Sequence, residues 1–202
     1  MLRETFAQFR PACLLLLVLT LLTGAAYPAT VTLLGNALFP GQAQGSLIRS
    51  NGRVLGSRLV GQPFHSPGRF WSRPSATTPA PYNAASSSGS NLGPLNPALA
   101  ESVEQRVANL RAIGGGAIVP LDLVTASASG LDPHISPEAA LYQVSRVAQA
   151  RGLPEESVRR LVERRTEPRT LGLLGEPRVN VLLLNMDLDS LVQNRDTSAT
   201  GN

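Results

Sequence analysis

The chain has 202 residues, of which 43% are hydrophobic and 16% are charged, and its formal net charge is +4. All 18 basic residues are arginine, which excludes chemistry that needs a lysine, such as a Schiff base or the lysine of a phosphate-binding P-loop. The single cysteine, Cys13, can form neither an internal disulfide nor a zinc cluster by itself. The length suits one domain with one additional segment.

The first feature in chain order is a leucine-rich segment without charges. No charged residue lies between Pro11 and Ile48, and residues 12–34 are long and apolar enough for a helix across a hydrocarbon layer of about 30 Å. A cleaved signal peptide is the alternative, because the small residues 24–26 suit a cleavage site. The apolar pattern continues beyond them to Phe39, which favours a retained transmembrane helix.

The placement of arginine predicts the orientation of this helix. Arg3 and Arg10 flank its start, whereas the first arginine after it is Arg49. Short flanks rich in positive charge stay in the cytoplasm. We therefore expect residues 1–11 in the cytoplasm and residues 35–191 in a single extracytoplasmic domain.

Turn signals organise the first part of that domain. Residues 46–62 contain Asn51-Gly52, the strongest short signal for a β-hairpin. Residues 73–97 are rich in Pro, Ser, Asn and Gly and predict a long loop. Its composition favours disorder, whereas side-chain turns of Asn and Ser would order it.

Helix caps organise the second part. Asn96-Pro97, Ser136-Pro137 and Pro154 each predict the start of a helix, and glycines near residues 114 and 152 predict the ends of the first two. The apolar runs Leu121–Thr125 and Val179–Leu184 predict strands.

This order of elements predicts an α/β fold, with a mixed α+β arrangement as the alternative. Beyond it, residues 192–202 are polar and predict a frayed tail.

Candidate chemical groups lie around residues 127–138. Asp132, His134 and Glu138 are weak metal-ligand candidates, because acids at the start of a helix are explained by its dipole. Ser127 or Ser129 with His134 would make an exported hydrolase, although the G-x-S-x-G pattern of a nucleophile elbow is absent. We predict neither a metal site nor a catalytic site and keep the hydrolase as the alternative function.

Nucleic-acid and nucleotide motifs are also weak. The two helices within residues 137–165 resemble a helix-turn-helix, but glutamates alternate with their arginines as on a solvent-exposed face, so no nucleic-acid partner is predicted. The sequence has no P-loop and no D-K-T-G-T phosphorylation segment. The chain therefore carries no motif for hydrolysing ATP by itself.

Four segments, residues 56–76, 82–97, 123–153 and 174–189, resemble the C subunit family (KdpC) of the Kdp potassium-transporting P-type ATPase. The resemblance implies a non-catalytic accessory subunit in the inner membrane. It implies three partners: a potassium-translocating A subunit, an ATP-hydrolysing B subunit and a small F subunit. It also implies a catalytic chaperone that raises the affinity of the ATP-hydrolysing partner for ATP, without a tightly bound cofactor of its own.

Two sets of site residues follow. If ATP contacts this chain, Gln143 and Arg146 beside Ser127 and Ser129 are the candidates, because an amide pairs with a base edge and arginine with phosphate. A partner-binding surface is expected on the acid-free loop region, through uncharged and basic side chains: Arg73, Ser75, Tyr82, Asn83, Ser90 and Asn91.

Overall fold

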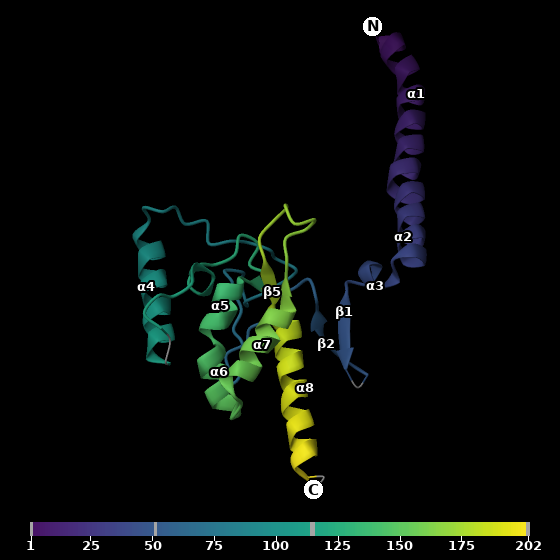
Figure 1. Ribbon diagram of the computed structural model, residues 1–202. Coiled ribbons are helices and arrows are strands. Elements are labelled where there is room, and N and C mark those ends of the chain that lie inside the picture. Colours follow the sequence, from purple (N-terminus) through teal and green to yellow (C-terminus); the bar gives the residue numbers. More distant parts are fainter. Residues whose placement is uncertain (1, 51, 114–115, 201–202) are drawn as a thin grey trace. The chain divides into compact units, whose positions relative to one another are not determined.

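A computed structural model describes residues 2–50, 52–113 and 116–200 of the chain. It divides into two compact units, Met1–Leu47 and Ile48–Asn202. Figure 1 shows both units, and each is described by itself below.

The first unit is a long helix followed by a short one. Helix α1 (Leu2–Leu21), the π-turn η1 (Leu22–Ala26) and α2 (Tyr27–Leu38) are continuous, and α3 (Pro40–Ala43) follows them. The part from Ala7 to Leu38 is apolar enough to span a membrane. At 1.5 Å per residue it is about 48 Å long, more than the roughly 30 Å of a hydrocarbon core. The predicted span, residues 12–34, lies inside this helix.

The π-turn follows from Pro28. A proline has no N–H to donate, and its ring collides with the carbonyl four residues earlier. The helix widens there, and the backbone N–H of Tyr27 donates to the carbonyl of Leu22. The hydroxyls of Thr23 and Thr30 donate to carbonyls four residues before them, at 2.7 and 2.8 Å. These side-chain polar groups are thus satisfied within the helix, as a hydrocarbon environment requires.

The second unit contains two small sheets. Strands β1 (Leu47–Ser50) and β2 (Arg53–Ser57) form the first sheet and confirm the two predicted strands of the hairpin, although Asn51 of its turn lies outside the described residues. The second sheet is antiparallel, in the order β3 (His134–Ile135), β5 (Arg178–Asn180) and β4 (Thr166–Glu167). Helices and antiparallel strands together make the mixed α+β arrangement.

Five helices accompany these strands in the described part of the second unit: α4 (Pro97–Ala112), α5 (Pro137–Tyr142), α6 (Val144–Arg151), α7 (Glu155–Arg165) and α8 (Val181–Thr200). The predicted starts are confirmed by their caps, since the side chains of Asn96 and Ser136 accept the N–H groups of Ala98 and Ala139 at 3.0 and 3.1 Å. Gly152 ends α6 with φ of +62°, which favours glycine.

Helix α4 ends at Ala112, and residues 114–115 of its predicted glycine stop lie outside the described residues.

Both predicted strands need correction. Leu121–Thr125 is wrong as a strand, because a 3₁₀ turn, η2 (Leu121–Leu123), occupies its start. Val179–Leu184 is a strand only as far as Asn180, where the side-chain oxygen accepts the N–H of Leu183 at 3.2 Å and caps α8. An apolar run of this length suits a buried strand and a buried helix turn equally, so hydrophobicity alone does not separate them.

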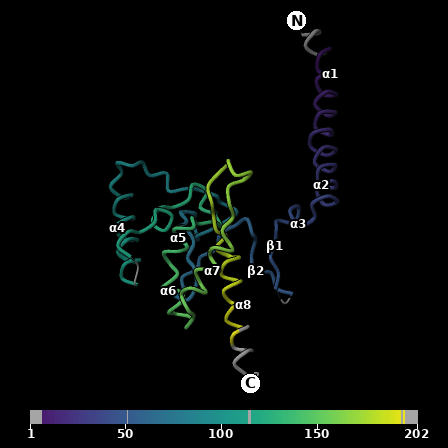
Figure 2. Tube along the Cα trace, in the orientation of Figure 1, coloured from purple at the N-terminus to yellow at the C-terminus, as the bar shows by residue number. Residues whose placement is uncertain are grey.

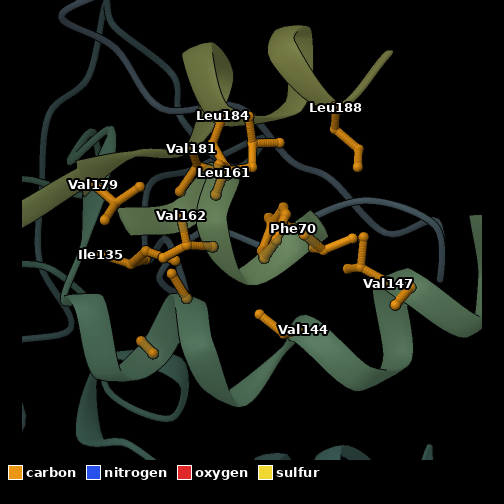
Figure 3. Packing of buried hydrophobic residues seen from close by; sticks show 14 of the residues in the cluster. Phe70, Ile135, Val144, Val147, Leu161, Val162, Val179, Val181, Leu184 and Leu188 are labelled. Carbon is orange, nitrogen blue, oxygen red and sulfur yellow. The ribbon is translucent and has the colours of Figure 1, made fainter. Parts of the chain in front are cut away.

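The hydrophobic core of the second unit lies between α5–α6, α7, β5 and the first turns of α8. Figure 3 shows Phe70, which comes from the long loop, among side chains of the helices. Phe70 is fully buried, as are Val147 of α6, Val158 of α7 and Leu184 of α8. A loop residue therefore sits at the centre of a core made mainly by helices.

That loop runs from residue 58 to residue 96, between β2 and α4 (Figure 2). It contains no helix or strand, and it includes the predicted loop 73–97 almost completely. Side-chain hydrogen bonds position it, and these bonds define the candidate functional site.

Candidate functional site

Two buried amide side chains hold the loop at consecutive residues. Asn185 of α8 accepts the N–H of Phe70 at 2.8 Å and donates to its carbonyl at 2.9 Å. Gln143, between α5 and α6, accepts the N–H of Trp71 at 2.7 Å and donates to its carbonyl at 3.2 Å. Both amides are only 1% exposed. Each amide therefore binds the loop backbone as a neighbouring β-strand would. We call these four residues the amide clasp.

Arginine side chains bind the loop just before the amide clasp. Arg146 donates to the carbonyls of Pro67 and Arg69, and its guanidinium carbon lies 4.4 Å from the centroid of the Trp71 ring. Burial lowers the pKa of Arg146 to about 10. Arg151 donates to the carbonyl of Gly68 at 2.6 Å. Three successive loop carbonyls are thus bound by cations of one helix, α6.

Asp189 of α8 connects the same arginines to the loop. It accepts Arg151 at 2.8 Å and Arg69 at 3.0 Å, one on each carboxylate oxygen. The carboxylate is about one-third exposed, so water weakens these ion pairs. Their main effect is to fix the directions of the two guanidinium groups.

The second half of the loop is held by hydroxyl groups. Ser75 Oγ accepts the N–H of Tyr82 at 2.9 Å and donates to the carbonyl of Gly130 at 2.7 Å. Thr77 Oγ1 accepts the N–H of Asn83 at 3.0 Å, and the hydroxyl of Tyr82 donates to the carbonyl of Arg73. Burial raises the pKa of Tyr82 to about 12, so this phenol stays protonated and keeps donating.

Gly130 allows the loop to approach the segment before β3. Its φ is +67°, and a Cβ added there would lie 2.5 Å from Thr77. The same segment accepts loop groups, because the carbonyl of Ser129 binds the N–H of Ser88 at 3.1 Å and the hydroxyl of Ser87 at 2.9 Å. Side-chain turns and this docking order the loop that composition alone describes as a linker.

Asp132 is the charged centre of this docking. It accepts Arg73 at 3.3 Å and the backbone N–H of His134 at 3.0 Å. Burial opposes ionisation of the carboxyl, but the hydrogen bonds from His134 and the charge of Arg73 outweigh it and lower the pKa of Asp132. Asp132 is therefore a structural anion that binds Arg73 and the backbone of His134.

Among the residues that the structure describes, clefts border the loop at several places, and three of them matter for the site. The first, of about 390 Å³, is lined by the aromatic side chains of Phe64, Trp71 and Tyr82 and by Arg106 of α4. The second, of about 210 Å³, lies beside Trp71 and Arg146. The third, of about 560 Å³, is lined by Ser127, Ser129, Arg73 and Asp132 among others.

The structure does not bring the four nucleotide candidates into one cleft. Arg146 lines the second cleft, whereas Ser127 and Ser129 line the third. The carboxamide of Gln143 bonds to Trp71, Arg146 and the carbonyl of Ala139. Its polar atoms are thus occupied inside the protein, and the nucleotide role stays a prediction.

The six partner-binding candidates divide into two groups. Four of them use their polar groups inside the protein, as described above: Arg73, Ser75, Tyr82 and Asn83. Ser90 and Asn91 are exposed, and Asn91 has a positive φ of 52°. Ser90 and Asn91 thus remain the accessible part of the predicted surface.

The alternative hydrolase is not favoured. Ser127 is buried, and the hydroxyl of Ser129 accepts the N–H of Leu131 at 3.1 Å in a tight turn. Within residues 2–50, 52–113 and 116–200 no hydrogen bond joins either serine to His134, and no cluster of three or more His, Cys, Asp or Glu forms a metal site.

Sequence reasoning missed one of the two most buried polar residues of the site, Asn185. Asn185 stands between two leucine-rich turns of α8, and Asp189 follows it one helical turn later. A polar residue inside an apolar run was the available signal, because such a residue requires a buried partner. The identity of that partner, a loop 115 residues away in sequence, is set only by the fold.

Known proteins share this sequence over almost its full length. A family model described as KdpC, the c chain of a K⁺-transporting ATPase, matches residues 9–190. Relatives named potassium-transporting ATPase KdpC subunit occur in Sorangium cellulosum, Polaromonas naphthalenivorans and Methylococcus capsulatus, at 65%, 63% and 61% identity. The alignments cover 91%, 90% and 91% of this chain and 97%, 94% and 98% of the relatives.

The amide clasp predicts a local loss of stability. Asn185→Ala or Gln143→Ala leaves a buried N–H and C=O of the loop without partners, which costs about 1–3 kcal/mol for each group. We expect each variant of the full chain in detergent to unfold at a lower denaturant concentration, followed by the fluorescence of Trp71, the only tryptophan. Gln149→Ala, on the exposed side of α6, is the matched control and should change the midpoint little. Equal midpoints for all three variants would contradict the clasp.

Asp132 predicts a pH-dependent contribution to stability. Its pKa is lower in the folded chain, so its stabilisation is present above the unfolded pKa of about 3.9 and is lost as the pH falls through the folded value. Asp132→Asn should therefore lower the free energy of unfolding at pH 6–7, and the difference from the unchanged chain should disappear in acid. Glu101→Gln, at an exposed position of α4, is the control. A difference that persists at low pH would show that the carboxylate charge is not the cause.

Proposed function

The chain belongs to the KdpC family, and from this membership we propose that it is a non-catalytic accessory subunit of an ATP-driven potassium-uptake complex in the inner membrane. The observation that carries the proposal is the family match, which includes both the membrane helix and the domain. Relatives of the same length carry the potassium-transporting ATPase name. The proposed partners are a potassium-translocating subunit, an ATP-hydrolysing subunit and a small third subunit, called KdpA, KdpB and KdpF.

The anchor supports a stabilising role in the assembly. One helix, Ala7–Leu38, is long and apolar enough to place this chain beside membrane-embedded partners. Arg3 and Arg10, which come before the predicted span of residues 12–34, favour a cytoplasmic N-terminus. The domain that starts at Ile48 is then extracytoplasmic, where it is positioned to bind the outer surface of the translocating subunit.

The site geometry supports a binding role rather than a chemical one. Its charged side chains hold the loop: Arg146 and Arg151 bind carbonyls, and Asp132 binds Arg73 and His134. These hydrogen bonds and ion pairs make the loop a rigid surface, which includes the exposed Ser90 and Asn91. Rigid surfaces bind partners with a smaller entropic cost than mobile loops.

We propose that this chain raises the ATP affinity of the ATP-hydrolysing partner indirectly. ATP is cytoplasmic, whereas the proposed position of the domain is on the other side of the membrane. The occupied carboxamide of Gln143 also supports an indirect effect. On this view, the chain favours the arrangement of the complex that binds ATP more tightly, and no ATP is bound tightly by this chain itself.

Purification of the complex tests the accessory role and the chaperone role separately. With the three partners co-expressed, we expect the tagged chain to co-purify with all of them. The complex prepared without it should show a several-fold higher KM for ATP in potassium-stimulated hydrolysis. A chain that purifies alone would overturn the accessory role, and an unchanged KM in a complete complex would overturn only the chaperone role.

A pair of clasp variants separates the indirect effect from direct ATP binding. Gln143→Ala and Asn185→Ala remove equivalent halves of the clasp, but only Gln143 is a nucleotide candidate. The indirect mechanism predicts similar changes of KM for ATP in both variants. A change confined to Gln143→Ala would indicate direct contact with the nucleotide.

Single cysteines test the orientation. In a Cys13→Ser chain, Leu95→Cys places a thiol on a side chain that is 95% exposed in the domain, and Gln8→Cys places one before the predicted span of residues 12–34. A membrane-impermeant maleimide added to intact spheroplasts should label only the first, and lysis should expose the second. The opposite pattern would reverse the proposed topology.

A further inference from the structure

Three exposed leucines lie together at the tip of the β4–β5 hairpin. Leu171, Leu173 and Leu174 are 88%, 81% and 63% exposed. In Figure 1 this hairpin projects from the domain in the direction opposite to α8. Single exposed apolar side chains are ordinary, but three within four residues at a projecting tip form an apolar patch that water does not favour. We call residues 169–176 the leucine tip.

Backbone hydrogen bonds order the leucine tip. Thr170 and Leu174 exchange both N–H···O bonds, at 2.9 and 3.0 Å, and the N–H of Gly172 donates to the carbonyl of Arg169 at 3.0 Å. Leu171 has a φ of +55° and Gly172 one of +73°, which closes a tight turn. The backbone of the turn is therefore ordered, and its leucine side chains stay exposed instead of packing onto the domain.

Arginines surround the foot of the leucine tip. Arg169 pairs with Glu176 at 2.6 Å, and Glu167 accepts both Arg58 at 2.8 Å and Arg178 at 3.1 Å. The three arginine side chains are 45–55% exposed. Three cations and two carboxylates leave one positive charge next to an apolar tip. This combination suits a layer that is apolar inside and anionic at its surface.

The chain enters the domain beside this foot. Strand β1 follows the membrane helix and pairs with β2, and Arg58, the residue after β2, binds Glu167 of β4. Residues 39–47 connect the end of α2 to the domain and span at most roughly 35 Å when fully extended. This short connection keeps the domain within reach of the bilayer that would hold the helix.

We propose that the leucine tip docks on the lipid surface of the membrane that holds the chain's own helix. The leucines enter the boundary between headgroups and acyl chains, and the guanidinium group of Arg178, which shares Glu167 with Arg58, binds a lipid phosphate. The helix and the tip then provide two attachments to one bilayer, which restrict the tilt of the domain. This inference requires the membrane span but not the proposed accessory role.

Fluorescence in vesicles tests the docking. In the full Cys13→Ser chain, Leu173→Cys is labelled with an environment-sensitive fluorophore and reconstituted into vesicles of phosphatidylcholine with about 30% phosphatidylglycerol, an anionic lipid. We expect at least twofold quenching by lipids that carry a spin label near the headgroup, and a blue-shifted emission. Leu95→Cys, on another exposed leucine of the domain, should show neither effect.

Two further measurements can overturn the proposal. Leu171→Asp/Leu174→Asp in the labelled chain changes only exposed side chains and should abolish the lipid quenching while the far-ultraviolet circular dichroism is kept. Equal quenching at Leu173→Cys and Leu95→Cys would overturn lipid docking. In the assembled complex the lipid quenching should persist. If the fluorophore is instead shielded from the spin-labelled lipids by a protein subunit, the tip binds a partner and lipid docking is overturned.

Discussion

The second unit depends on how two buried amides bind an extended loop. Gln143 lies between α5 and α6 and Asn185 lies in α8, and they bind the backbone of adjacent residues, Trp71 and Phe70. A buried peptide group without partners is costly, and an amide side chain supplies one donor and one acceptor in the geometry that a peptide needs. With these bonds made, the ring of Phe70 can sit in the centre of the helical core. Replacing either amide affects the loop and the core together.

The same arrangement explains why a long polar loop is an ordered surface. Arginines of α6 bind the carbonyls before Phe70, while Ser75 and Thr77 bind the backbone after it. Ordering a loop of this length costs conformational entropy for every residue. The enclosed aromatic side chain and the satisfied hydrogen bonds offset that cost. A rigid loop surface suits the accessory role proposed for this chain, because such a surface binds partners with a smaller entropic cost.

This structure separates residues that bind other parts of the chain from residues that face outward. Residues that carry recognisable chemistry in the sequence, such as Asp132, Gln143 and Arg146, bind other parts of the chain. The residues that face outward include uncharged ones: Ser90 and Asn91 of the loop and the leucines on the β4–β5 hairpin. Function in this family member is therefore expected from its surfaces and its anchor.

The sequence by itself determined the features that depend on local interactions. The long apolar helix follows from composition. The starts of α4 and α5 follow from Asn96 and Ser136, and the end of α6 from Gly152, because each cap bonds within its own turn. The family also followed from sequence, since its segments are long and distinctive. Only the tertiary structure decided whether Val181 continues a strand or starts a helix, and which backbone Gln143 and Asn185 bind. The loop residues that the two amides bind lie more than 70 residues away in sequence, and neither hydrophobic spacing nor residue type specifies which distant groups the fold brings together.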